Sequence, residues 1–144
     1  MKLTEHFTLE ELTVSELAER KGLDNTPNAT EITNLMRTAL LLEQVRELLK
    51  KPIMINSAFR SKAVNDAVGS KDSSQHRIGC AADIRVPGMT PKQVVEAIIA
   101  SDIPYDQVIR EFDSWTHISV TNTTANNPRR QALIIDKQGT RLYS

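Results

Sequence analysis

The stretch Ser74-Gln75-His76-Arg77-Ile78-Gly79-Cys80-Ala81-Ala82-Asp83 decides how this sequence is interpreted. A histidine precedes an aspartate by seven residues, and the run from Cys80 to Val86, closed by Pro87-Gly88, is typical of a short strand. Side chains alternate between the two faces of a strand, so Asp83 lies on one face while Ala82 and Ile84 lie on the other. The pattern predicts an apolar core behind the strand and a carboxylate in front of it.

A second predicted strand, residues 115–120, repeats this alternation. Its parity places Trp115, His117 and Ser119 on one face. If the two strands are neighbours, Asp83 and His117 share a face, and the loop before Cys80 brings His76 alongside them. Two histidines and one carboxylate are the usual protein ligands of a catalytic zinc, whose fourth position is left for water. Spacing alone leaves open that the histidines are structural and that Asp83 is a capping or salt-bridging carboxylate.

The remaining patterns predict one α+β domain over residues 1–144. We expect helices at 8–21, 30–51 and 91–100, of which the first ends at Gly22 and the last begins at Thr90-Pro91. Further strands are expected at 53–56, 108–109 and 132–135, with a hairpin turn at 136–139 and an exposed loop at 121–130. The long helix carries one apolar stripe: Ile32, Leu35, Met36, Ala39, Leu42, Val45 and Leu49.

Composition excludes several function classes. Lys plus Arg and Asp plus Glu both number 18, so no basic excess exists for nucleic acid or a membrane surface, and we expect neither as a partner. The single cysteine, Cys80, excludes an intramolecular disulfide and is expected to be a small buried residue. The N-terminus lacks the apolar stretch of a signal peptide, so we expect synthesis in the cytoplasm. His6 is expected at the surface without an acidic partner. Arg129-Arg130 are expected in a solvated loop, with contact to an anionic polymer as the alternative.

The motifs resemble those of the zinc D-Ala-D-Ala carboxypeptidase family, which includes phage and bacterial murein peptidases and shares its fold with the hedgehog signalling domain. Residues 74–83 resemble its S-x-H-x-x-G-x-A-x-D signature. Residues 56–61, 64–69 and 115–119 look like its S-G-Y-R-S, V-N-x-x-V-G and W-x-H-x-S stretches. The resemblance covers nearly the whole chain. It implies a hedgehog/DD-peptidase-like fold, with N-terminal helices packed on a small, mainly antiparallel sheet that carries the zinc site.

The resemblance also implies the ligands and the catalytic groups. His76, Asp83 and His117 are the implied ligands of one Zn²⁺ per chain. Arg60 matches an arginine that lies near the substrate carbonyl or carboxylate, where its donors would stabilise an oxyanion. We also expect Ser74, Trp115 and Ser119 to contact substrate or support the ligands.

The catalytic base is where this sequence departs from many family members. They place an acid three residues before the second histidine, and here that position is Ser114. Hedgehog-type domains and small phage members resemble this chain in having a glutamate six residues before it, which is Glu111. We therefore expect Glu111 to be the general base, with Asp113 as the alternative.

The function implied is zinc-dependent hydrolysis of an amide bond in bacterial peptidoglycan peptides, by carboxypeptidase action or by endopeptidase action on the stem or cross-link. Such a chain fits a phage or prophage lysis protein (an endolysin) that a holin-type partner releases to the cell wall, or a tail or virion component. The alternative, favoured by the departure at Ser114, is a non-catalytic zinc domain that binds cell-wall peptide or a protein partner.

Overall fold

The computed structural model describes residues 1–143. Its first two helices are α1 (Leu9–Thr13) and α2 (Glu16–Lys21), where the sequence predicted one helix over 8–21. The prediction of one continuous helix is wrong because Val14 takes an extended backbone and the Ser15 side chain accepts the Ala18 N–H, which starts a new helix. The expected capping box between Thr8 and Glu11 is present.

The long helix α3 (Ala29–Leu49) follows the prediction closely. Asn28 and Glu31 cap its start reciprocally, and Lys50 ends it in a left-handed conformation two residues before Pro52. Four residues of the predicted stripe are buried: Leu35, Ala39, Leu42 and Val45. Met36 is 44% exposed, because it is one residue, and so about 100° around the helix, from Leu35.

Within the described residues, six strands form one sheet in the order β1-β2-β4-β3-β5-β6. Their bounds are β1 (Met54–Ser57), β2 (Ala81–Arg85), β3 (Gln107–Glu111), β4 (Trp115–Ser119), β5 (Gln131–Asp136) and β6 (Gly139–Leu142). All neighbours pair antiparallel except β3 and β5, which are parallel. The mainly antiparallel sheet and the hairpin turn at 136–139 are confirmed. The strand after that turn, β6, was not itself predicted, because its sequence GTRL is short, polar and fully exposed.

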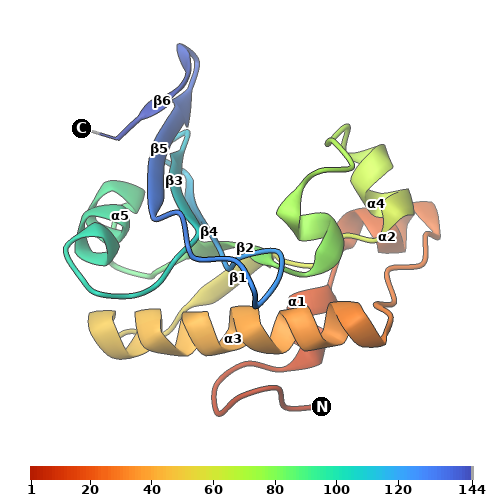
Figure 1. Ribbon diagram of the computed structural model, residues 1–144. Helices are drawn as coiled ribbons and strands as arrows, with labels where there is room; N and C mark the ends of the chain where they lie inside the picture. The colour runs from red at the N-terminus through yellow and green to blue at the C-terminus, as the bar shows by residue number, and fades with distance from the viewer. Residues whose placement is uncertain (144) are drawn as a thin grey trace.

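The sheet has helical segments on both faces (Figure 1). On one face lies α5 (Pro91–Ile99), and α3 runs beneath the sheet; on the other face lies the segment that carries α4 (Lys62–Ala67) and the 3₁₀-helix η1 (Gln75–Ile78). The apolar face of β2 packs in the main core, as its alternation predicted. This face and the residue after the strand contribute Ala82, Ile84 and Val86, α3 contributes Leu42 and Val45, and α5 contributes Val94 and Ile98. Neither α4 nor η1 was predicted as a helix from the sequence.

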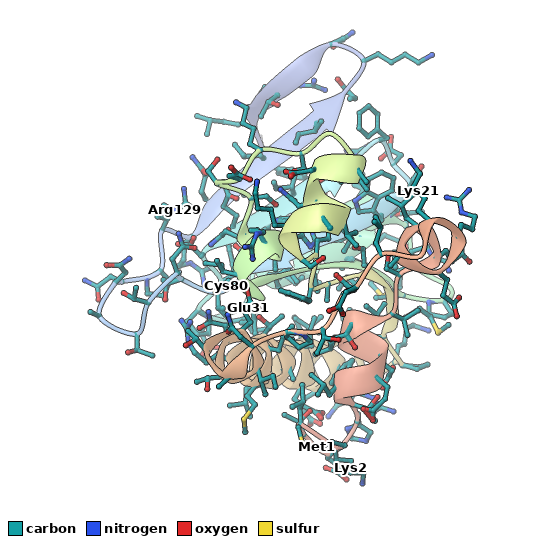
Figure 2. The ribbon with its side chains drawn as sticks, turned by 90° about the vertical axis from the view of Figure 1, so that its right-hand side faces the viewer. Met1, Lys2, Lys21, Glu31, Cys80 and Arg129 are labelled. Atoms are coloured by element: carbon teal, nitrogen blue, oxygen red, sulfur yellow. The ribbon has the colours of Figure 1, made fainter. Side chains whose placement is uncertain are left out.

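Side chains of α3 hold η1 and the glycine that follows it. Arg77 forms an ion pair with Glu31 at 2.9 Å, and Glu31 lies where α3 meets this segment (Figure 2). Asn34 Nδ2 donates to the Ile78 carbonyl at 2.9 Å, and Thr38 Oγ1 donates to the Gly79 carbonyl at 2.7 Å. The long helix is therefore the base on which the His76 segment is held.

The structure shows partners within the chain for three exposed side chains that the sequence left without one: those of His6, Arg129 and Arg130. His6 does have an acidic partner, since its Nδ1 lies 2.7 Å from Glu43 Oε1 on α3, a contact between residues too far apart in sequence for spacing to predict. Arg129 and Arg130 are exposed, as expected, and each also has a partner: Arg129 pairs with Asp106 at 2.7 Å, and the Arg130 guanidinium lies 4.5 Å from the centre of the Tyr105 ring.

Cys80 has 0% exposure, as expected for a small buried residue. Among the described residues, none of the helices is both long and apolar enough to cross a membrane.

Candidate metal centre

Two of the predicted ligands lie directly opposite each other on paired strands. In the antiparallel register of β2 and β4, Asp83 faces His117. The His117 Nδ1 atom lies 3.0 Å from Asp83 Oδ1, and both side chains are about nine-tenths buried. The shared face that the sequence alternation predicted is therefore confirmed.

The third residue, His76, comes from η1 and not from the sheet. Ser74 caps η1 by accepting the His76 N–H, and Gly79 ends it at a φ of 83°. A Cβ atom at Gly79 would lie 2.8 Å from the Glu31 carbonyl oxygen of α3, so only glycine fits this approach. This short turn carries the buried His76 ring to 3.3 Å from Asp83 Oδ1, measured from Nε2.

A backbone carbonyl fixes the tautomer of His76. Its Nδ1 lies 2.6 Å from the Ala58 oxygen, which can only accept, so Nδ1 carries the proton. In the neutral ring Nε2 then has a lone pair that faces the Asp83 carboxylate. Two acceptors at this distance repel each other unless a proton or a cation lies between them. A backbone partner on the other ring nitrogen is the usual support of a metal-binding histidine.

The donor set fits a zinc ion. One ligand atom from each of His76, Asp83 and His117 lies within 4.8 Å of the others, and all three residues are buried. Tetrahedral zinc with bonds of about 2.0–2.2 Å places its ligand atoms roughly 3.3–3.6 Å apart. Burial acts to raise the pKa of Asp83, but the adjoining His76 and His117 outweigh it and hold that pKa well below its usual range. That effect of the histidines needs a proton on the ring nitrogen that faces Asp83, and a cation in the same place favours the ionised carboxylate in the same way.

Glu111 is the acidic side chain next to this group. Glu111 is the last residue of β3 and pairs with Trp115 of β4 across the hairpin. Its Oε1 lies 4.0 Å from His117 Nδ1. Burial, and then the negative charge of Asp83, raise the pKa of Glu111, while His117 and Arg60 act in the opposite direction. The carboxylate is 17% exposed, so it is shielded but still reachable from solvent.

Asp113 lies apart from the cluster. Phe112 and Asp113 take positive φ angles of 52° and 50°, as in the tight turn that joins β3 to β4. The Asp113 carboxylate is 64% exposed and pairs with Arg110. Arg110 is adjacent to Glu111 in β3, so strand alternation directs it to the opposite face of the sheet. The structure therefore brings Glu111, and not Asp113, to the histidines.

Arg60 reaches the other side of the cluster. Its backbone N–H donates to the His76 carbonyl at 3.0 Å, and its Nη2 lies 3.5 Å from Asp83 Oδ2. The side chain is 19% exposed, which leaves part of the guanidinium open to a ligand. The structure thus brings Arg60 and Glu111 to the same three-residue group.

The three residues expected at the substrate differ in their placement. Ser74 lines a cleft beside His117 while its hydroxyl caps η1. Trp115 is half-buried and its ring centre lies 6.1 Å from that of Phe112. Ser119 has 0% exposure and its Oγ accepts the Gln107 N–H at 3.0 Å, so the structure places it inside the sheet and not on the cleft surface.

The cleft itself was not anticipated from the sequence. Its volume is about 740 Å³, and its walls come from the segment before η1, from β3 and from the loop over 121–130. Gln75, Asp106 and Arg129 meet there through hydrogen bonds across 23 and 31 residues of chain. Contacts so distant in sequence have no spacing signal, and Asp106 in particular follows no motif that would have marked it.

Fold and site together define a chain with a buried His₂Asp group able to hold a metal ion, an adjacent glutamate and an adjoining cleft. Comparison with known protein families gives the same class, because the model of the family described as Peptidase M15 matches residues 5–119. The chain belongs to this family, whose members are zinc-dependent peptidases. No curated protein sequence matches the chain. The family match ends before β5 and β6, so this hairpin lies outside the matched region.

Proposed function

We propose that this chain hydrolyses an amide bond in peptides of bacterial peptidoglycan, either as a D-Ala-D-Ala carboxypeptidase or as a murein endopeptidase. One observation carries the proposal: His76 Nε2 and His117 Nδ1 both face Asp83 Oδ1, at 3.3 and 3.0 Å. Glu111 Oε1 lies 4.0 Å from the same His117 nitrogen. Membership of the peptidase M15 family supports the reaction class. The resemblance of residues 56–61, 74–83 and 115–119 to murein peptidases supports the substrate.

His76, Asp83 and His117 would hold the zinc ion. When bound, the ion supplies Lewis-acid chemistry, which polarises a carbonyl and lowers the pKa of a water molecule. Glu111 takes a proton from the attacking water through its carboxylate and delivers it to the nitrogen of the leaving amine. The C–O bond to water forms before the C–N bond breaks, the nitrogen receives the proton as it leaves, and the products are a carboxylate and an amine.

Arg60 stabilises the charge that develops during this reaction. The attacked carbonyl oxygen becomes negative, and a positioned guanidinium favours that charge more than it favours the neutral ground state. Its contacts with Asp83 and with the His76 backbone hold it beside the reacting group. Trp115 forms an apolar wall next to Glu111 in this proposal.

The biological setting belongs to the same proposal. A small murein peptidase of this kind acts as a phage or prophage lysis protein released by a holin-type partner, or as part of a tail or virion. Its partner is then the stem or cross-link peptide of the cell wall. The support is the motif resemblance to phage peptidases, since neither charge nor composition offers a nucleic-acid or membrane partner.

The test is digestion of purified peptidoglycan followed by mass spectrometry of the soluble fragments. We expect new fragments with the zinc-loaded protein, none after chelation, and restoration when zinc is returned; the fragment masses name the bond. Glu111→Gln, matched by Asp113→Asn as a control, should lose turnover by about 10²–10⁴-fold while it keeps its zinc. Intact murein of several chemotypes alongside tightly bound zinc would refute hydrolysis and favour a zinc domain that only binds wall peptide.

A further inference from the structure

The cleft beside His117 has walls made chiefly of hydrogen-bonding groups. Five side-chain amides line it: Gln75, Gln107, Asn122, Asn126 and Asn127. Ser73, Ser74 and Thr121 also line it; the Ser74 hydroxyl caps η1, and the Thr121 hydroxyl accepts from Arg37 and donates to the Thr123 carbonyl. Because the cleft includes His117, a ligand that occupies it lies next to the metal group. Its polarity suits an extended peptide, whose backbone offers the same kinds of groups.

Two ionised residues in the cleft differ sharply in exposure. The Asp106 side chain is 6% exposed, whereas that of Arg129 is 52% exposed. Arg129 lies on the loop at the rim of the molecule, on the face that also carries the η1 segment (Figure 2). A ligand that enters the cleft therefore meets the guanidinium and not the carboxylate.

Asp106 holds Arg129 in one orientation. The Arg129 Nε atom lies 3.1 and 3.2 Å from the two carboxylate oxygens, and Nη2 lies 2.7 Å from Oδ2. Gln75 Nε2 also donates to Oδ2 at 3.1 Å, and the Arg129 backbone N–H donates to Oδ1 at 3.1 Å. Within residues 1–143 no hydrogen bond uses Arg129 Nη1, so this group is oriented in advance and still has its protons to donate.

We propose that this cleft is a substrate subsite in which Arg129 binds a carboxylate carried by the peptide, several residues from the bond that is cut. The inference rests on the proposed function and adds to it a class of substrate: stem peptides whose side carboxyl groups are free and not amidated. Asp106 neutralises the formal charge of Arg129, so recognition depends on directed N–H donors more than on long-range attraction. The expected preference is accordingly about tenfold.

Binding of two synthetic stem pentapeptides tests the proposal. They differ only in whether the side carboxyl groups are free acids or carboxamides, and their affinities are measured by calorimetry with the zinc-loaded Glu111→Gln protein, which keeps them intact. We expect the free acid to bind about tenfold more tightly. Adding Arg129→Gln should remove this preference. Adding Arg141→Gln should not, because Arg141 makes a similar 2.7 Å ion pair, with Asp136, in the β5–β6 hairpin outside the cleft.

The ratio of the two affinities is the deciding quantity. If Arg129→Gln only disturbs the cleft, both peptides weaken equally, the ratio is unchanged and the proposal is overturned; it is also overturned if the parent protein shows no preference. Failure of the proposed function gives a different result. Murein that stays intact in the digestion assay refutes hydrolysis, while an Arg129-dependent preference in binding would still support the subsite.

Discussion

Replacing Gly79 by alanine tests how much the close contact between η1 and α3 contributes to the unfolding free energy. Gly79 has a φ of 83°, and an added Cβ would lie 2.8 Å from the Glu31 carbonyl oxygen and 3.1 Å from Leu35 Cγ. Gly69 provides a matched control, because its φ is 75° but an added Cβ there meets no atom within 4 Å. Both alanine variants have the left-handed backbone cost, and only Gly79→Ala adds a collision.

The magnitudes follow from these two contributions. An L-residue in the left-handed region costs about 1–2 kcal/mol. Forcing an extra methyl group into a close-packed site costs about 1–3 kcal/mol more, since a backbone oxygen has little freedom to move. We therefore expect Gly69→Ala to lose about 1–2 kcal/mol of unfolding free energy, and Gly79→Ala about 2–5 kcal/mol.

Urea unfolding monitored by circular dichroism measures both values, and the difference between the two variants isolates the contact with α3. In thermal unfolding, each kcal/mol corresponds to a shift of about 2–4 °C for a chain of this size. Equal losses for the two variants would refute the argument, because they would show that η1 can move away from α3 at no cost.

Three further predictions follow from the site and its surroundings. Chelation should lower the midpoint of thermal unfolding and added zinc should raise it, because a ligand that binds only the folded state stabilises it; an Asp83→Ala protein should show no response to zinc. Asp113→Gly should raise the unfolding free energy by about 0.5–1 kcal/mol and leave murein digestion unchanged, because this position has a φ of 50° and its carboxylate points away from the histidines; lost turnover would contradict this. Burial raises the pKa of Asp106, but hydrogen bonds and charge from Arg129 outweigh it and lower that pKa, so the ion pair stabilises the fold above about pH 4 and is lost as the pH falls. Asp106→Asn should therefore lower the unfolding free energy by about 1–2 kcal/mol at pH 7. The difference in unfolding free energy between this variant and the parent should narrow below about pH 4, as measured by urea titrations at each pH.

The elements with strong local signals were predicted well from the sequence. Capping pairs fixed the starts of α1 and α5, a left-handed glycine fixed the end of α2, and alternation in β2 gave its buried face. The elements that were missed have weak local signals. The helix break at Val14 depends on one serine cap, and β6 is a polar strand at the edge of the sheet that pairs with β5.

The candidate site divides in the same way. Alternation within each strand predicted that Asp83 and His117 point to the same side, and motif resemblance singled out His76. The resemblance favoured Glu111 and left Asp113 as the alternative, because both precede His117 in one short hairpin. The structure separates them through a tight turn with two positive φ angles, after which Glu111 lies beside His117 and Asp113 pairs with Arg110.

By itself, the sequence determined what is periodic or local: the apolar faces, the caps and the residue types able to bind a metal. These depend on the fixed geometry of strands and helices, in which neighbours a few residues apart have known relative directions. Only the tertiary structure decided which distant groups meet. Three such contacts depend on packing of the whole chain: η1 packs on α3, the Ala58 carbonyl sets the proton position of His76, and Arg129 pairs with Asp106. Packing is cooperative and has no signature in any single stretch of sequence, so these contacts appear only in the folded molecule.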